Sequence, residues 1–146
     1  MTRNTVLLCT VALALAVVYV TFLSDWLRPP RIQIIPQIRP LRSADGTFPV
    51  SFTLDGSYRL TSIEVVECAA YSTNKHVAPI WHLVSRSNSV PTQGLTYGIP
   101  VRGMVPFVSN STPVRLKGDV PYRLLLEAGR AKGSVDFKTR EALPEQ

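Results

Sequence analysis

Residues 48–54 read FPVSFTL, and large apolar side chains alternate there with Pro, Ser and Thr. The even-numbered positions carry Phe, Val, Phe and Leu, so all the large apolar side chains fall on one parity. This two-residue period is typical of a β-strand with one buried face. Asp55-Gly56 follows directly as a turn signal. The run therefore predicts a strand that packs one face on a core and ends in a turn.

The same period continues downstream. Tyr58 and Leu60 share one parity, whereas Ile63 and Val65 share the other, so we expect a bulge near residues 61–62 to restore the buried face. Further strand-like segments follow at residues 79–85, in short pieces over 95–108, and at 122–127 and 135–137. No amphipathic helix accompanies them. The sequence predicts an all-β domain, an antiparallel β-sandwich of about seven strands.

The N-terminus predicts a transmembrane helix. Residues 4–24 contain no charged side chain, and at about 1.5 Å per residue they span roughly 31 Å, the thickness of a hydrocarbon core. Trp26 follows at the expected interface, and Pro29-Pro30 ends any helix. We divide the chain into an anchor (1–27), a Pro- and Arg-rich linker that can include an edge strand (28–45), the β-sandwich (46–140) and a tail (141–146).

A cleaved signal peptide is the competing interpretation of this segment. Residues 14–16, Ala-Leu-Ala, resemble a small-residue cleavage site. Cleavage there would leave a mature chain that begins VVYVTFL at Val17. Because an exposed apolar tail of this kind suits no soluble product, we expect the segment to stay as an uncleaved single-pass anchor.

Small residues line one face of the predicted helix. Cys9, Ala12 and Ala16 fall on this face, and small side chains allow two membrane helices to approach closely. We interpret these three residues as a helix-packing face. Alanine is also common in apolar helices of every kind, and the pattern is equally compatible with a plain tether.

Four arginines follow the anchor, at the depth of lipid phosphates: Arg28, Arg31, Arg39 and Arg42. They predict contacts with lipid headgroups, each worth about 1 kcal/mol near an anionic surface; a solvated basic spacer is the alternative. Counted by the positive-inside rule, these arginines place the β-domain in the cytoplasm. A sandwich behind a near-N-terminal anchor usually lies outside, and we assign it to the periplasm or the exterior of a bacterial cell.

Composition narrows the possible partners. Sixteen basic residues stand against ten acidic ones, a net charge of +6 that favours anionic partners. No zinc-finger spacing or basic-aromatic RNA-binding motif is present, so nucleic acid is not expected. Cys9 lies in the anchor and Cys68 in the β-domain, so the two cannot pair within one chain.

The sequence carries no recognisable catalytic motif. His76 and His82 are the only histidines, and a metal site would need Cys68, Met104 or a carboxylate beside them. Neither a nucleophile elbow nor a glycine-rich phosphate loop is present. We expect no enzymatic activity and no cofactor.

Residues 116–122, LKGDVPY, carry a resemblance to a known fold family. Their Leu-to-Tyr spacing resembles the turn before the penultimate strand of fibronectin type III and immunoglobulin-like sandwiches. The resemblance implies that Leu116, Gly118 and Tyr122 form a structural corner in which the tyrosine hydroxyl bonds back to the backbone. Residues 97–104, YGIPVRGM, also resemble a segment of small bacterial envelope proteins of unknown function.

Together these features predict a non-catalytic, membrane-anchored accessory or scaffolding subunit. Its partners would be the bilayer and the subunits of a larger membrane protein complex, contacted through both helix and sandwich. Two alternatives stay open. One is a membrane-tethered metal-binding or enzymatic domain, and the other is a free-standing envelope receptor for a peptide or glycan.

Overall fold

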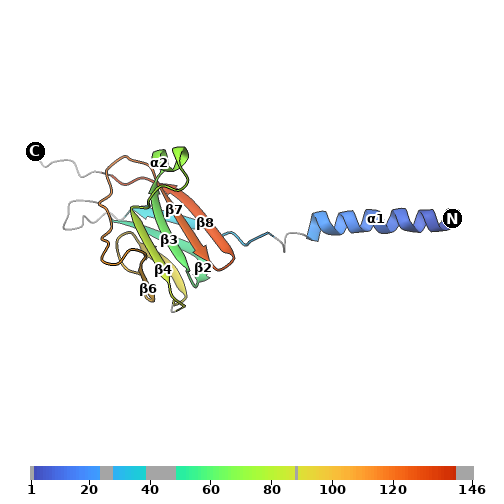
Figure 1. Ribbon diagram of the computed structural model, residues 1–146, viewed down its shortest axis with the longest axis horizontal. Helices are drawn as coiled ribbons and strands as arrows, with labels where there is room; N and C mark the ends of the chain where they lie inside the picture. The colour runs from blue at the N-terminus through green and yellow to red at the C-terminus, as the bar shows by residue number, and fades with distance from the viewer. Residues whose placement is uncertain (1, 24–27, 39–48, 88, 141–146) are drawn as a thin grey trace, which may run out of the picture. The chain divides into compact units, whose positions relative to one another are not determined.

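The computed structural model describes residues 2–23, 28–38, 49–87 and 89–140 (Figure 1). These residues form two compact units. One unit contains the N-terminal helix, and the other, which begins at Arg31, contains every described strand.

Helix α1 (Arg3–Leu23) is long and apolar enough to cross a membrane. All of its residues are exposed. Two of its threonines are satisfied locally: the Thr10 and Thr21 hydroxyls donate to the carbonyls of Val6 and Val17 at 3.0 and 2.9 Å. Bonding back to the preceding turn lets threonine sit in an apolar helix without an unpaired donor.

The first sheet is three-stranded and antiparallel. Its strands, in spatial order, are β1 (Ile34–Ile38), β2 (Val50–Tyr58) and β5 (Thr92–Thr96). Strand β1 lies within the segment predicted as a linker, and Pro36 sits on it at the sheet edge, where a missing N–H is tolerated. Ile32, two residues before β1, is also buried in the core. The β-domain therefore includes residues upstream of position 46.

The second sheet has five antiparallel strands. In spatial order they are β6 (Met104–Pro106), β4 (Trp81–Ser85), β3 (Ser62–Glu67), β7 (Tyr122–Ala128) and β8 (Ala131–Phe137). A short helix, α2 (Cys68–Thr73), follows β3 and was not expected from the sequence. Figure 1 shows the two sheets stacked face to face as a sandwich, with α2 at one end.

The core fills the space between the sheets. Val50, Phe52 and Leu54 of β2 are at most 3% exposed, which confirms the buried parity predicted for residues 50–54. Phe52 meets Phe137 of β8 edge-on, with ring centroids 4.9 Å apart, and so joins the two sheets. Edge-to-face aromatic pairs add about 0.5–1.5 kcal/mol beyond the area they bury. Phe48 lies outside the described residues.

The prediction of a bulge near residues 61–62 is wrong. Strand β2 ends at Tyr58 in the first sheet and β3 begins at Ser62 in the second. The chain therefore crosses the core between them, and Leu60 and Ile63 on either side of the crossing are both fully buried. The change of parity marks a change of sheet. The described part of the chain also has eight strands rather than about seven.

Candidate functional site

The predicted helix-packing residues Cys9, Ala12 and Ala16 lie on α1, and all three are exposed. Their spacing of three and four residues places them along one helical face. Its role in packing on another helix stays a prediction.

Two of the four predicted lipid-contacting arginines are described, and both are exposed. Arg31 forms an isolated parallel bridge with Lys132 at the start of β8, and the next residue, Ile32, donates its N–H to the Lys132 carbonyl at 2.9 Å. Arg39, Arg42 and the predicted tail 141–146 lie outside the described residues.

The segment predicted as a corner lies just before β7. Leu116 and Tyr122 are 7% and 3% exposed, and the Lys117 N–H donates to the Tyr122 hydroxyl at 3.0 Å. Gly118 bridges to Thr139, and the neighbouring Asp119 N–H donates to the Thr139 carbonyl at 2.9 Å. The tyrosine therefore ties the loop to the strand it begins, and the Gly118 backbone ties it to the chain after β8.

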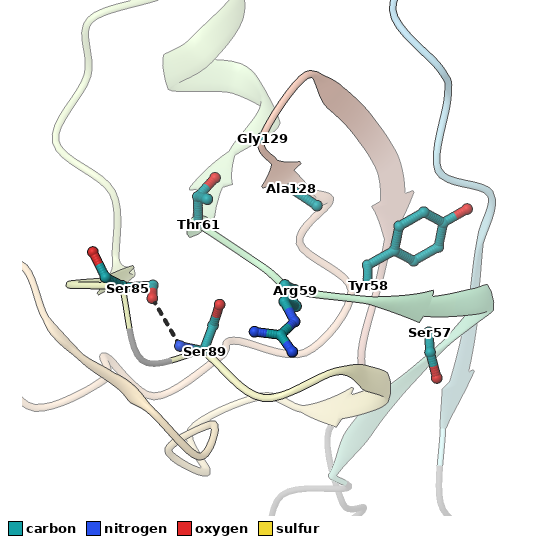
Figure 2. Close-up of a pocket in the computed structure, with 9 residues that line it drawn as sticks. Ser57, Tyr58, Arg59, Thr61, Ser85, Ser89, Ala128 and Gly129 are labelled. Atoms are coloured by element: carbon teal, nitrogen blue, oxygen red, sulfur yellow. Dashed lines mark hydrogen bonds between the residues drawn. The ribbon is translucent and has the colours of Figure 1, made fainter.

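A polar pocket of about 520 Å³ opens at the opposite end of β7 (Figure 2). Three connections supply its walls: the β2–β3 crossing, the end of β4 with the loop after it, and the turn between β7 and β8. Its side chains include Ser57, Tyr58, Arg59, Thr61, Ser85 and Ser89. The exposed Arg59 guanidinium extends toward Ser89 in Figure 2. Sequence reasoning missed this pocket because its residues come from strands whose pairing was unknown.

Hydrogen bonds fix the rim of this pocket. The Ser89 N–H donates to Ser85 Oγ at 3.1 Å (Figure 2), and Thr61 Oγ1 donates to the Glu127 carbonyl at 3.0 Å. The Tyr58 hydroxyl donates to Asp55 Oδ1 at 2.7 Å, and this hydrogen bond raises the pKa of Tyr58. Because the Thr61 and Tyr58 hydroxyls already donate elsewhere, the donors that the pocket presents to an oxyanion are its serine hydroxyls and the Arg59 guanidinium.

A second hollow, of about 590 Å³, runs along β5, the edge strand of the first sheet. Its floor is polar, and Ser51 Oγ and Thr96 Oγ1 lie 3.0 Å apart there. Residues 99–102 form an apolar wall that ends in Arg102. Among the described strands β5 pairs only with β2, and a strand edge of this kind beside a groove can accept an extended peptide.

The two histidines occupy different elements. His82 lies on β4 with Nε2 3.3 Å from Glu64 Oε1, and its ring stacks on Phe107 at 4.6 Å between centroids. His76 lies in the loop after α2, where its backbone N–H donates to Asn74 Oδ1 at 2.9 Å. In the ranges that the structure describes, no three His, Cys, Asp or Glu side chains gather closely enough to hold a metal ion.

Cys68 belongs to a cluster on the outer side of the second sheet that the sequence did not reveal. Arg123 and the cross-strand Asp136 form a two-point ion pair, at 2.6 Å (Nε to Oδ1) and 3.0 Å (Nη2 to Oδ2), and Tyr71 of α2 packs over the guanidinium at 5.4 Å. The hydrogen bonds from Arg123 lower the pKa of Asp136. Burial, followed by the Asp136 charge, raises the pKa of the Cys68 thiol, which disfavours the reactive thiolate.

Comparison with known proteins adds no relative to this picture. No family model, curated protein or solved structure matches the chain. The described surfaces include a pocket with hydrogen-bond donors at one end of the sandwich and a groove beside the edge strand β5.

Proposed function

We propose that this protein is a non-catalytic, membrane-anchored accessory subunit that packs on a larger membrane protein complex. Its helix stays in the mature chain and docks on a partner helix, and its sandwich lies on the periplasmic or outer side of a bacterial membrane. The observation that carries the proposal is an apolar helix, long enough to cross a membrane, with a line of small residues along one face.

In a membrane the solvent of this helix is lipid. Hydrocarbon tails are as apolar as leucine, so helices in a bilayer associate chiefly through close packing, and small residues permit it. Cys9, Ala12 and Ala16 offer such a surface, whereas the flanking Val11 and Leu15 suit contact with lipid.

Enlarging the small residues tests the proposal. The double variant Ala12→Leu/Ala16→Leu keeps the helix apolar and inserted but holds a partner helix away, so we expect co-purification in mild detergent to fall several-fold while membrane localisation persists. The matched control Val11→Ile/Leu15→Val changes the neighbouring face and leaves co-purification intact. If the Ala12/Ala16 variant co-purifies with the complex as well as the parent does, the helix makes no specific contact and acts only as a tether.

We also propose that the sandwich is of the immunoglobulin or fibronectin type III kind. Two features support this: two antiparallel sheets between which the chain crosses after β2, β4 and β5, and a tyrosine at the start of the penultimate strand whose hydroxyl bonds back to the loop before it. A domain of this kind presents strand edges and end loops for binding rather than a buried catalytic cleft.

The groove along β5 favours a second candidate, a free-standing envelope receptor for an extended peptide. Here the chain would migrate as a single copy in mild detergent, and a peptide would add to the edge of β5. Loss of peptide binding on Gly94→Pro would support this candidate, because proline at that edge removes a backbone donor.

A further inference from the structure

One end of the β-domain is fixed as the attachment point of the anchor. The chain enters the domain at Arg31, whose neighbour Ile32 bonds to Lys132 next to the β7–β8 turn. Strand registers place the end of β2, the start of β3 and the end of β4 at the same end. We call this the tethered end, comprising residues 31–33, 57–62, 85–87 and 128–132. The polar pocket of Figure 2 opens there.

Covalent connection limits how far the tethered end can lie from lipid headgroups. Seven residues separate Leu23, the last residue of α1, from Arg31, so the connection spans at most about 28 Å. The opposite end of the domain lies about 20 Å further along β7. The headgroup layer is therefore within reach of the tethered end at high effective concentration.

The tethered end presents arginines whose charges are not neutralised locally. Arg59, Arg86 and Arg130 are exposed, come from three separate connections and form no ion pair within the described residues. Of the nearby acidic groups, Glu127 pairs with Lys132 at 3.4 Å, whereas Asp55 accepts a hydrogen bond from Tyr58 and keeps its charge. With Arg31, which is also exposed, the tethered end carries four arginines, and Arg59 is the one that lines the pocket.

The pocket adds hydroxyl donors to this charge. Ser85 Oγ accepts the Ser89 N–H, which leaves the Ser85 hydroxyl hydrogen free to point into the pocket beside Arg59 (Figure 2). Arg59 supplies the planar, two-point donor geometry that matches phosphate oxygens. An oxyanion on a slender headgroup fits an open pocket of about 520 Å³.

We propose that this pocket is a binding site for the phosphate of anionic phospholipids, with Arg59 as its central donor and Arg86 and Arg130 as its outer charges. The proposal rests on the proposed membrane anchor but not on a protein partner. It assigns the pocket at the tethered end of the sandwich to a lipid ligand rather than to a protein.

Nuclear magnetic resonance on the full chain in neutral detergent micelles tests this site. The probes are dihexanoyl phosphatidylglycerol, dihexanoyl phosphatidylcholine and inorganic phosphate, each titrated while the backbone amide signals of residues 85–87, 89 and 128–130 are followed. We expect the anionic lipid to shift these signals with higher affinity than the other two probes.

Variants of Arg59 test whether this residue is the donor to the lipid phosphate. Arg59→Gln should weaken binding of the anionic lipid about fivefold, and Arg59→Lys, which keeps the charge, should retain most of it. Arg140→Gln removes an exposed arginine at the opposite end and should leave binding unchanged. Equal shifts with both lipids, or unchanged affinity in Arg59→Gln, would overturn the site. Tighter binding of inorganic phosphate than of lipid would overturn the lipid assignment, whatever the outcome of the helix-packing test.

Discussion

Removing the hydroxyl of Tyr122 tests how the loop before β7 is held. In Tyr122→Phe the ring keeps its place, 3% exposed and 5.9 Å from the Phe137 ring, so little packing is lost. The change removes the acceptor for the Lys117 N–H. The expected cost is therefore that of one hydrogen bond and the donor it leaves behind.

The magnitude follows from where that donor lies. A buried donor without a partner costs about 1–3 kcal/mol. Lys117 itself is exposed, so water can reach its N–H once the loop relaxes, and the lower end of this range applies. We expect Tyr122→Phe to cost about 1 kcal/mol, which for a domain of this size lowers the unfolding midpoint by about 4 °C.

Thermal unfolding of the full chain in neutral detergent, followed by near-ultraviolet circular dichroism, measures this shift. Tyr58→Phe is the matched control, since its hydroxyl bonds to the exposed Asp55, and its midpoint should move by less than half as much. If Tyr122→Phe unfolds at the parental temperature, the hydroxyl does not hold the corner and the argument fails.

Two further changes probe the β-domain. Gly133→Ala should destabilise it by about 1–3 kcal/mol, because the added Cβ would lie 2.5 Å from the Ile32 carbonyl oxygen; Gly56→Ala, where the nearest atom is 3.7 Å away, serves as the control in the same thermal assay. The Arg123 hydrogen bonds lower the pKa of Asp136 in the folded state, so this pair stabilises the fold above the unfolded pKa of about 3.9 and loses that contribution as the pH falls further. Both side chains are partly exposed, which limits this contribution to about 1 kcal/mol. Asp136→Asn should therefore flatten the curve of unfolding midpoint against pH below pH ~4. An unchanged curve would refute the contribution of this ion pair.

Local periodicity in the sequence predicted the parts of the fold that depend on neighbouring residues. The buried parity of residues 50–54 and the apolar helix over residues 3–23 follow from the local pattern alone, because each pattern indicates which side chains face water and which face an apolar environment. The change of parity at residues 58–63 was visible in the sequence, but its cause was not. A bulge within one strand and a crossing between sheets produce the same alternation.

Features that depend on strand pairing could not be read from the sequence. Arg123 and Asp136 stand 13 positions apart and meet only because β7 and β8 pair in one register. Arg59, Ser85 and Ser89 line one pocket only because the β2–β3 crossing and the β4–β5 loop share one end of the sandwich. Side-chain type predicted what these residues could do, whereas the topology decided which of them lie together.

The most direct test of the account is the native mass of the full chain released from its own membrane in mild detergent. The account predicts an intact N-terminus on a 16.1 kDa chain that travels within a much larger assembly. Recovery of a single chain without protein partners, or of a chain that begins at Val17, would contradict it.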